Sequence, residues 1–586
     1  MKRLIWLALI AAPLVALGYV AIVHSQKLGH PEMAPAAEPQ LQDEAPPLKV
    51  QVTPWGPTQE MLDGAKTTLA SQAQVRRALK GARSRMLSLE LIVDDDKTDE
   101  KPNAEATPPN RYRGIFYDYT NNVTIVAESS FDRPEQVNVT TTSWQPQPSA
   151  EEMDEALEIL KADPTLGPGL LDERVQAYPP MPPLYFPEKS KGKTERIINV
   201  GLLAKDASDK SVERANEVVA VNLSQQTVLR FPSGAPPTSK ASPTASCGPA
   251  SSGSSTGRGV AGQFNFVITD PADGSEVWNF LAIRPSASSG VDASGIELQN
   301  VKYKGKLVLK RAHVPILNVQ YDGNTCGPFR DWEYAESQFN ADPTNGTTVT
   351  PGVRSCTVPA TTQLDTSVDS GNFQGIAFYG SGASVTLVSE MSAGWYRYIS
   401  EWNFSKDGVI GPRFGMGATL NSCTCNGHVH HAYWRFDFDI DNSSPNRVVE
   451  GGPPRPRLPL DGVIKNEMRR YRDHKGIFWT IENPNTHDAY KIVPNLNDGT
   501  AISDAYGGGD LWFLSYSATE IDDSGVASST AAGLNSFVNG QKMQNTDLVV
   551  WYGIHIDHNR AGGQIMGHPN IAGQFVAGPD LVPVHW

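Results

Sequence analysis

The second half of this 586-residue chain is built from short segments in which apolar and polar residues alternate. Between Phe264 and Trp586 these segments follow one another, with Gly, Asp and Asn residues at the breaks. Because successive side chains of a β-strand point to opposite faces, such alternation is typical of strands that bury one face. About 320 residues of this kind predict two antiparallel sheets packed face to face. We therefore expect residues 261–586 to form one large antiparallel β-sandwich domain.

The first half has a different organisation, in which a helical segment precedes several strand-like runs, twice in succession. One helix is expected over Thr58–Leu79 and the second over Ala150–Lys161. This repetition predicts two small α+β domains, residues 51–147 and residues 148–232. The fold class is therefore α+β and mostly β, with the sandwich as the largest part.

The segments around these domains have other compositions. Residues 25–50 are rich in Pro, Ala, Glu and Gln, which indicates a flexible tether, and residues 233–260 have almost no large apolar side chains, which indicates a linker. Residues 1–24 contain an uncharged apolar run, Leu4 to Val23, which follows two basic residues. Such a run can cross about 30 Å of hydrocarbon, and a signal segment is the rival interpretation. We expect a membrane-anchored protein that faces outside the cytoplasm, or a secreted or periplasmic one if the segment is cleaved.

Composition limits the classes of partner and the role of disulfides. The chain has 50 basic and 64 acidic residues, a net charge of −14. A general nucleic-acid binder needs a basic surface that displaces counterions, so we expect no nucleic-acid partner. Five cysteines are too few to hold the fold, although an exported chain can form disulfides. A bond between Cys326 and Cys356 would close one loop, Cys423 and Cys425 stand close together, and the connectivity stays open.

His428 and His430 give the most specific chemical signal. They stand two residues apart at the start of an alternating run, so on a strand both project from the same face. Imidazole nitrogens suit copper or zinc. The third ligand would be His555 or His558, and we favour His555 because it falls within the apolar alternation, where an unpaired buried imidazole is costly. The plainer interpretation is a pair of surface or interface histidines without a metal.

Two aromatic segments accompany the histidines. In one of them Tyr396, Tyr398 and Trp402 fall on one strand face, as they would in any packed aromatic sheet. In the other, Asp331 stands among aromatic residues, where burial raises the pKa of a carboxyl group and suits it to act as a base. A surface Asp331 paired with Arg330 fits the sequence equally well.

Taken together, these segments resemble the copper-containing, topaquinone-dependent primary-amine oxidases over nearly the whole chain after the tether. The resemblance implies copper ligands at His428, His430 and His555, with His558 beyond the metal, and it places at Tyr396 the tyrosine that becomes topaquinone. The motifs that carry the resemblance, besides HxH at 428–430 and the run after Gly394, are VWNF (277–280), IELQNVKY (296–303), LKRA (309–312), RFDFD (435–439), DLVVW (547–551) and IHI (554–556).

Further positions follow from the same resemblance. It implies that Asp331 is the catalytic base and that Tyr321 is the tyrosine that hydrogen-bonds the quinone oxygen. It also implies a peripheral calcium site, whose oxygen ligands suit a hard cation. These ligands are the side chains of Asp437, Asp439 and Asp547 and the carbonyl groups of Phe438 and Leu548.

The implied activity is the oxidation of a primary amine to an aldehyde by dioxygen, with release of ammonia and hydrogen peroxide, in a homodimer. Trp395 and Arg397 depart from the family, which usually has Asn before the modified tyrosine and an acid after it. The alternative is therefore a copper-binding relative that is catalytically altered or inactive and has a binding or scaffold role. An unrelated exported β-sandwich with a mononuclear hydrolase site is a third hypothesis.

Overall fold

The computed structural model describes residues 47–92, 107–181, 195–204, 216–230, 255–322, 329–419, 421, 423–452, 462–472, 476–504, 506–523, 530–558 and 576–586. The expected anchor over residues 1–24, nearly all of the tether and most of the linker lie outside these residues. Within the described part, no helix is both long enough and apolar enough to span a membrane.

The large domain contains a first sheet, which we call the histidine sheet, of ten described strands in the order β1-β10-β11-β12-β13-β21-β28-β27-β24, with β14 beside β13. All of its pairings are antiparallel. Its strands are β1 (Lys49–Pro54), β10 (Gln263–Thr269), β11 (Glu276–Ile283), β12 (Glu297–Tyr303), β13 (Lys306–Tyr321), β14 (Phe329–Arg330), β21 (His428–Phe438), β24 (Met468–Arg470), β27 (Leu511–Ser515) and β28 (Leu548–His558).

The second sheet, which we call the tyrosine sheet, has twelve described strands in the order β15-β16-β17-β18-β19-β20-β30-β26-β25-β22-β23, with β29 beside β20. Its pairings are antiparallel except for β16 with β17. Its strands are β15 (Thr347–Thr350), β16 (Val353–Cys356), β17 (Ile376–Ser381), β18 (Ser384–Ala393), β19 (Tyr396–Ser405), β20 (Ile410–Ala418), β22 (Arg447–Gly451), β23 (Val463–Ile464), β25 (Phe478–Glu482), β26 (Ala489–Val493), β29 (Val576–Ala577) and β30 (Asp580–His585).

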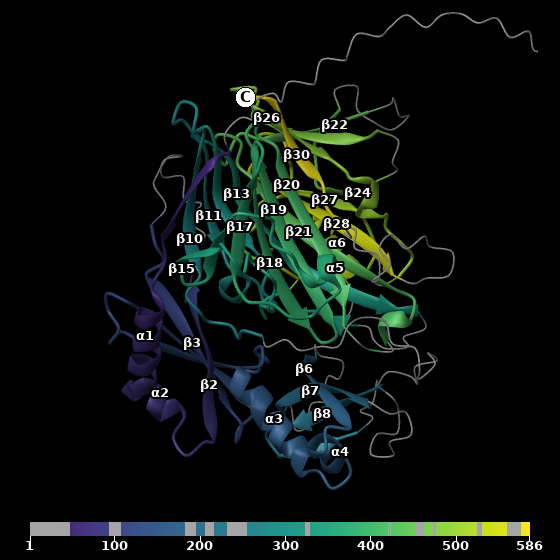
Figure 1. Ribbon diagram of the computed structural model, residues 1–586. Helices are drawn as coiled ribbons and strands as arrows, with labels where there is room; N and C mark the ends of the chain where they lie inside the picture. Colours follow the sequence, from purple (N-terminus) through teal and green to yellow (C-terminus); the bar gives the residue numbers. More distant parts are fainter. Residues whose placement is uncertain are drawn as a thin grey trace, which may run out of the picture. The chain divides into compact units, whose positions relative to one another are not determined.

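The two sheets share one large apolar core (Figure 1). Trp278 of β11 meets Phe404 of β19 edge to face, with ring centroids 5.2 Å apart, and Trp434 of β21 meets Phe414 of β20 in the same way at 6.3 Å. Inward-facing aromatic residues of both sheets therefore interdigitate, as in a sandwich. Short helical segments lie in the connections: η1 (Pro285–Ala287), α5 (Gln363–Thr366), η3 (Cys423–Cys425), η4 (Leu496–Asp498) and α6 (Thr530–Phe537).

Two four-stranded antiparallel sheets precede the sandwich, each with two helices. The first comprises α1 (Gln59–Ser71), α2 (Ala73–Ala78), β2 (Ser84–Ile92), β3 (Arg111–Asp118), β4 (Val123–Ser130) and β5 (Asn138–Thr142). The second comprises α3 (Ala150–Ala162), α4 (Gly167–Leu171), β6 (Val175–Met181), β7 (Ile197–Ala204), β8 (Asn216–Asn222) and β9 (Thr227–Leu229).

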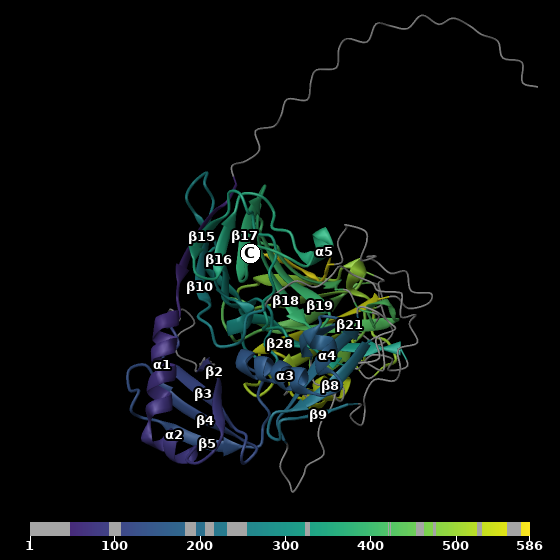
Figure 2. The ribbon, with the colours of Figure 1, turned by 60° about the horizontal axis from the view of Figure 1, so that its bottom comes forward.

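Capping and amphipathic spacing explain the longer helices. The side chain of Thr58 caps α1, and Ser149 with Glu152 forms a capping box at the start of α3. The apolar face of α1 packs on the sheet formed by β2–β5, and Figure 2 shows α1 and α2 along one face of that sheet. The expected fold class, α+β and mostly β, is confirmed.

One segment differs from the expected organisation. Residues 49–54, which the sequence analysis divided between the tether and the first small domain, form β1 at the edge of the histidine sheet and pair with β10. Val50 and Val52 alternate with polar residues, and both pack against the core of the sandwich. Burial of these two side chains explains why this segment pairs with a sheet whose other strands begin 200 residues later in the chain.

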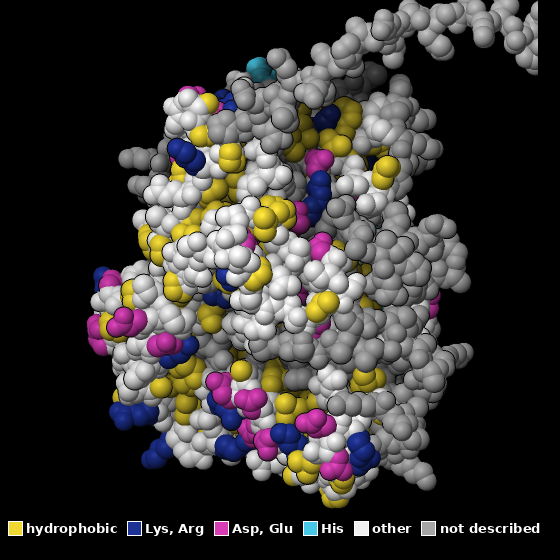
Figure 3. Space-filling view, in the orientation of Figure 1, with side chains coloured by type: hydrophobic (Ala, Val, Ile, Leu, Met, Phe, Trp, Pro, Cys, Tyr) yellow, Lys and Arg dark blue, Asp and Glu magenta, His cyan; other side chains and the backbone are white. Residues whose placement is uncertain are grey.

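Charged side chains of both signs occur on one face of the molecule. On the face drawn in Figure 3, Lys and Arg side chains are interspersed with Asp and Glu over the lower part of the molecule.

Candidate active site

The register of β21 with β28 decides which histidines meet. His428 lies opposite His558, and His430 lies opposite Ile556. Cross-strand partners share a face of the sheet, and so do residues two apart on one strand. His428, His430 and His558 therefore project together into the sandwich. One ring nitrogen from each lies within 4.8 Å of the other two, and His428 Nε2 is 3.0 Å from His558 Nδ1.

The expectation that His555 is the third ligand is wrong. His555 stands three residues before His558 on β28, so its side chain projects from the opposite face of the sheet. It lies opposite His431, not opposite either histidine of the HxH pair. Its Nδ1 is 2.8 Å from Nδ1 of His431, and its Nε2 contacts Asp510. The structure thus brings His558, which the sequence analysis had placed beyond the metal, into the triad.

The triad fits a transition metal. The outer nitrogens of two of its rings are already used: His428 Nδ1 bonds the carbonyl of Asn426, and His430 Nδ1 bonds the hydroxyl of Tyr398 at 3.1 Å. The remaining nitrogen of His430, Nε2, is buried and has no hydrogen-bond partner among the residues that the structure describes. Burial lowers the pKa of both His428 and His430 well below the usual value. Neutral imidazoles with inward lone pairs are the form that binds copper or zinc.

Tyr396 reaches this triad from the other sheet. It is the first residue of β19 in the tyrosine sheet, and its hydroxyl makes a short hydrogen bond with His428 Nε2 and lies 3.3 Å from His558 Nδ1. Its ring also meets that of His430 edge to face, with centroids 4.5 Å apart. A buried phenol therefore stands directly beside the three candidate ligands, where the resemblance had placed the cofactor tyrosine.

Asp331 is connected to the same cluster through Tyr398. The Tyr398 hydroxyl donates a short hydrogen bond to Asp331 Oδ2, and the same hydroxyl lies 3.1 Å from His430 Nδ1. Burial raises the pKa of Asp331 to about 7, although the hydrogen bond from Tyr398 opposes that rise. The carboxyl group is therefore partly ionised near neutral pH, which suits a general base.

Arg330 pairs with other acids than its neighbour Asp331. Its guanidinium group contacts Asp523 at 2.6 and 3.1 Å and Asp292 at 2.9 Å, and all three residues are buried. The plainer interpretation of the sequence, a surface Asp331 paired with Arg330, is wrong. Arg330 instead balances two acids behind the site and leaves the Asp331 carboxyl group to Tyr398.

Tyr321, at the end of β13, lies against the triad as well. Its ring stacks on that of His428, with centroids 4.5 Å apart and an interplanar angle of 23°. Its hydroxyl accepts a hydrogen bond of 2.9 Å from the indole Nε1 of Trp395. Trp395, one of the two departures from the family pattern, therefore fixes a tyrosine of the site.

Arg397, the other departure, directs its charge away from Tyr396. Its Nε and Nη2 contact both oxygens of Asp369 at 2.7 and 2.8 Å, and its Nη1 contacts the backbone carbonyls of Gly394 and Tyr396. Neighbouring residues of a strand face opposite sides, so the guanidinium group and the Tyr396 phenol lie on different faces of β19. Its charge is neutralised there by Asp369.

Three carboxylates lie close together, near the ends of β21 and β28 that are farther from the triad. Oxygens of Asp437, Asp439 and Asp547 lie within 4.8 Å of one another. Phe438 and Leu548, whose carbonyl groups the resemblance also implied, pair across β21 and β28 and bury their side chains in the core. Oxygen donors at this spacing suit a hard cation.

The structure contradicts one of the disulfide bonds that the sequence analysis left open. Cys356 is a free, buried thiol, so the bond from Cys326 to Cys356 that would close the intervening loop is wrong. Cys423, just before the HxH pair, is disulfide-bonded. Both Cys247 and Cys326 lie outside the described residues.

Sequence comparison finds a copper-containing amine oxidase that is similar to part of this chain. No protein-family model matches the chain. A curated Arabidopsis thaliana protein described as "Amine oxidase [copper-containing] gamma 2" is 25% identical over 277 residues, which cover 36% of this chain and 39% of that relative. The matched region thus spans well under half the length of the relative.

Structural comparison covers nearly the whole chain. A copper-containing benzylamine oxidase from Hansenula polymorpha has a TM-score of 0.56 at 13% identity, over 90% of this chain and 97% of that chain. An Aspergillus nidulans amine oxidase gives 0.54 at 12% identity, over 91% and 88%. The Pichia pastoris lysyl oxidase gives 0.51 at 12% identity, over 90% and 88%. The fold is therefore that of the copper-containing amine oxidases, and the resemblance inferred from the sequence motifs is supported.

Proposed function

We propose that this chain is a copper- and topaquinone-dependent oxidase that converts a primary amine and dioxygen into an aldehyde, ammonia and hydrogen peroxide. The observation that carries the proposal is the contact of the Tyr396 hydroxyl with His428, inside a cluster of three buried histidines. A phenol in this position is where oxidation by a bound copper ion would act. The fold and the partial sequence similarity to copper-containing amine oxidases support the same reaction class.

His428, His430 and His558 are the residues that would hold the copper ion. A bound copper ion would supply the chemistry by which dioxygen oxidises the Tyr396 side chain to a quinone, and that quinone would accept two electrons from the amine. The protein supplies neutral imidazoles whose outer nitrogens are held by Asn426 and Tyr398, so the rings are oriented before the metal arrives.

Asp331 would remove the proton from the carbon next to the amine nitrogen. Its raised pKa keeps the carboxyl group close to half-ionised at neutral pH, so it can accept that proton and release it again. Tyr398 holds Oδ2 of this carboxyl group through its hydroxyl and leaves the other oxygen for the substrate. The burial of Asp331, Tyr396 and Tyr398 excludes bulk water from the reacting atoms.

The environment of Arg397 favours an active enzyme over the catalytically altered relative. A positive charge next to the cofactor tyrosine was one reason for that alternative, and Asp369 neutralises it on the other face of the strand. Trp395 lies closer to the site, where its indole donates to Tyr321. If the protein binds copper but does not form the quinone, that result would support the alternative, a catalytically altered relative with a binding or scaffold role.

The other expectations remain part of this proposal. A calcium ion would bind Asp437, Asp439 and Asp547, since three carboxylates within 4.8 Å of one another carry more negative charge than the guanidinium group of Arg435, which contacts Asp437, offsets. A homodimer and a location outside the cytoplasm, with the N-terminal segment in or released from a membrane, follow from the resemblance and from the sequence.

The test combines metal analysis with a carbonyl reagent on the purified protein. We expect bound copper and a coloured adduct with phenylhydrazine, and we expect Tyr396→Phe to retain copper while it loses the adduct. His558→Gln should lose the adduct and the copper of the triad, because it removes one of the three ligands. Copper without an adduct in the unmodified protein would contradict the oxidase and support the altered relative. Zinc instead of copper, with Asp331→Ala harmless to activity, would support a hydrolase site.

A further inference from the structure

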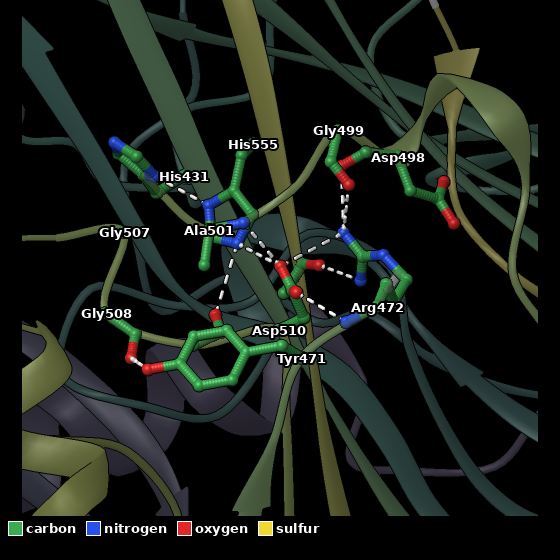
Figure 4. Close-up of polar contacts among 12 residues, drawn as sticks. His431, Tyr471, Arg472, Asp498, Gly499, Ala501, Gly507, Gly508, Asp510 and His555 are labelled. Carbon is green, nitrogen blue, oxygen red and sulfur yellow. Dashed lines mark hydrogen bonds and ion pairs between the residues drawn. The ribbon is translucent and has the colours of Figure 1, made fainter. Parts of the chain in front are cut away.

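A second cluster of histidines lies on the outer face of the same two strands. His431 of β21 and His555 of β28 are cross-strand partners, and their Nδ1 atoms are 2.8 Å apart (Figure 4). Each ring is held from behind by a carboxylate. His431 Nε2 is 3.1 Å from Asp504 Oδ2, and His555 Nε2 is 3.1 Å from Asp510 Oδ1. The two rings are almost completely buried.

The hydrogen bonds fix where the ring protons are. An ionised carboxylate only accepts, so the Nε2 atom that faces it must carry the proton in each ring. The His555 Nε2 also faces the carbonyl oxygen of Gly509 at 3.1 Å, and that group is again only an acceptor. A neutral imidazole has one ring proton, so in two neutral rings both Nδ1 atoms would present lone pairs. Two lone pairs 2.8 Å apart repel each other unless a proton or a metal ion lies between them.

The charges around the pair also favour a cation there. Burial opposes the shift, but the hydrogen bond from His431 lowers the pKa of Asp504, and the hydrogen bond from His555 with the charge of Arg472 lowers the pKa of Asp510. Both carboxyl groups are therefore ionised at neutral pH. One guanidinium group, that of Arg472, faces Asp510 at 3.6 Å, while it also donates to the carbonyls of Gly499 and Gly553. Two negative charges and one positive charge leave a deficit at the pair.

We propose that His431 and His555 bind a second transition-metal ion, copper or zinc, through their Nδ1 atoms, on the face of the strand pair opposite to the His428 triad. The spacing supports this assignment, because the closest donor atoms of the triad are 3.0 Å apart, nearly the same distance as here. Bonds of 2.0–2.1 Å in a tetrahedral site set the two nitrogens about 3.3 Å apart, so each ring moves by only about 0.25 Å.

Asp504 and Asp510 complete the arrangement, in which a carboxylate orients each metal-bound imidazole through its outer N–H. Among the described residues no third His, Cys, Asp or Glu joins these two nitrogens within ligand distance. Water therefore fills the remaining positions. The Asp504 side chain keeps 15% of its exposure and is the most exposed of the four side chains in this cluster, so the solvent lies on its side of the pair.

Zinc titration of the metal-free full chain tests the proposal, with calcium in excess to saturate the peripheral carboxylates. We expect the unmodified protein to bind two equivalents of Zn²⁺ and His555→Gln to bind one. His558→Gln should also bind one, and the double variant none. His487→Gln, which alters an exposed histidine, is the matched control and should keep two. One equivalent in the unmodified protein, or two in His555→Gln, would overturn the proposal. The short contact between the two rings would then be a hydrogen bond in which they share a proton.

A milder variant covers the case in which His555→Gln does not fold. Asp504→Asn keeps an oxygen for the backbone N–H groups of Tyr506 and Gly507 but removes the charge behind His431. Loss of such a carboxylate typically weakens metal binding 10–100-fold, so the second equivalent should weaken by that factor while the first is unchanged. Equal weakening of both, or of neither, contradicts a separate site. The result is independent of the oxidase activity, because His558→Gln reports on the triad alone.

Discussion

At the scale of single residues, the environment of Asp331 converts an ordinary carboxyl group into a base that works near neutrality. Burial raises its pKa to about 7, and only the ionised form accepts a proton. We therefore expect kcat at saturating amine to rise about tenfold per pH unit below that value and to level off above it. Asp331→Asn should lower kcat by about 10²–10⁴-fold and keep the copper content. A profile without an inflection between about pH 6 and 8 would contradict this role.

Arg330 is the residue whose loss should cost the most stability near the site. It is buried between Asp292 and Asp523, so Arg330→Met leaves two acids without their positive partner. We expect the free energy of unfolding to fall by about 3–5 kcal/mol in chemical denaturation. Arg174→Met, which alters an exposed pair with Asp172, is the control and should cost less than about 1 kcal/mol. Equal effects would show that the buried acids protonate at little cost.

At the scale of elements, the pair β21 and β28 explains both what the sequence predicted and what it missed. The HxH spacing placed His428 and His430 on one face, and the structure agrees. The same rule applied to β28 would have found His558, because Ile554, Ile556 and His558 share the face that enters the core. The error was to treat the apolar alternation around His555 as evidence for the inner face, when Trp551 and Tyr433 belong to a second apolar cluster on the outer face.

The second histidine pair carried a weaker signal in the sequence. His431 and His555 are 124 residues apart, and only the strand register brings them together. Asp504 and Asp510 come from the connection between β26 and β27, whose position no local pattern predicts. Alternation can identify the face on which a histidine lies, but it cannot identify the partner strand or the loop that covers that face.

The connection that covers this second pair should be sensitive to a single methyl group. Gly499 has φ +65°, and a Cβ there would overlap the carbonyl oxygen of His555. Gly499→Ala should lower the free energy of unfolding by about 2–5 kcal/mol, from backbone strain plus overpacking. Gly540→Ala is the matched control, because Gly540 also has positive φ (+87°) but no atom of the described part of the chain lies within 4 Å of the added Cβ. It should cost about 1–2 kcal/mol; equal losses would exclude the contact with β28 as the cause.

At the scale of the whole molecule, the candidate active site is made by two sheets that face each other. The histidine sheet contributes His428, His430 and His558, and Asp331 directly follows its strand β14, while the tyrosine sheet contributes Tyr396. Alternation over some 300 residues was enough to predict a sandwich, because each strand must bury one face. It could not show which residues of the two sheets meet across the core, since those contacts depend on sheet order and register. The resemblance to a known family supplied that information for Tyr396 and Asp331.

This arrangement predicts that metal binding at the triad stabilises the whole sandwich. The ion would bind three residues of the histidine sheet, and His428 is also hydrogen-bonded to Tyr396 of the tyrosine sheet. At free copper 100-fold above the dissociation constant, linkage adds about 2.7 kcal/mol to the free energy of unfolding. Copper removal by a chelator should therefore lower the melting temperature in calorimetry, and returned copper should restore it. In His558→Gln, which keeps the His431–His555 pair, most of that copper-dependent shift should vanish. A shift of the same size in that variant would mean that copper stabilises the molecule from a site other than the triad.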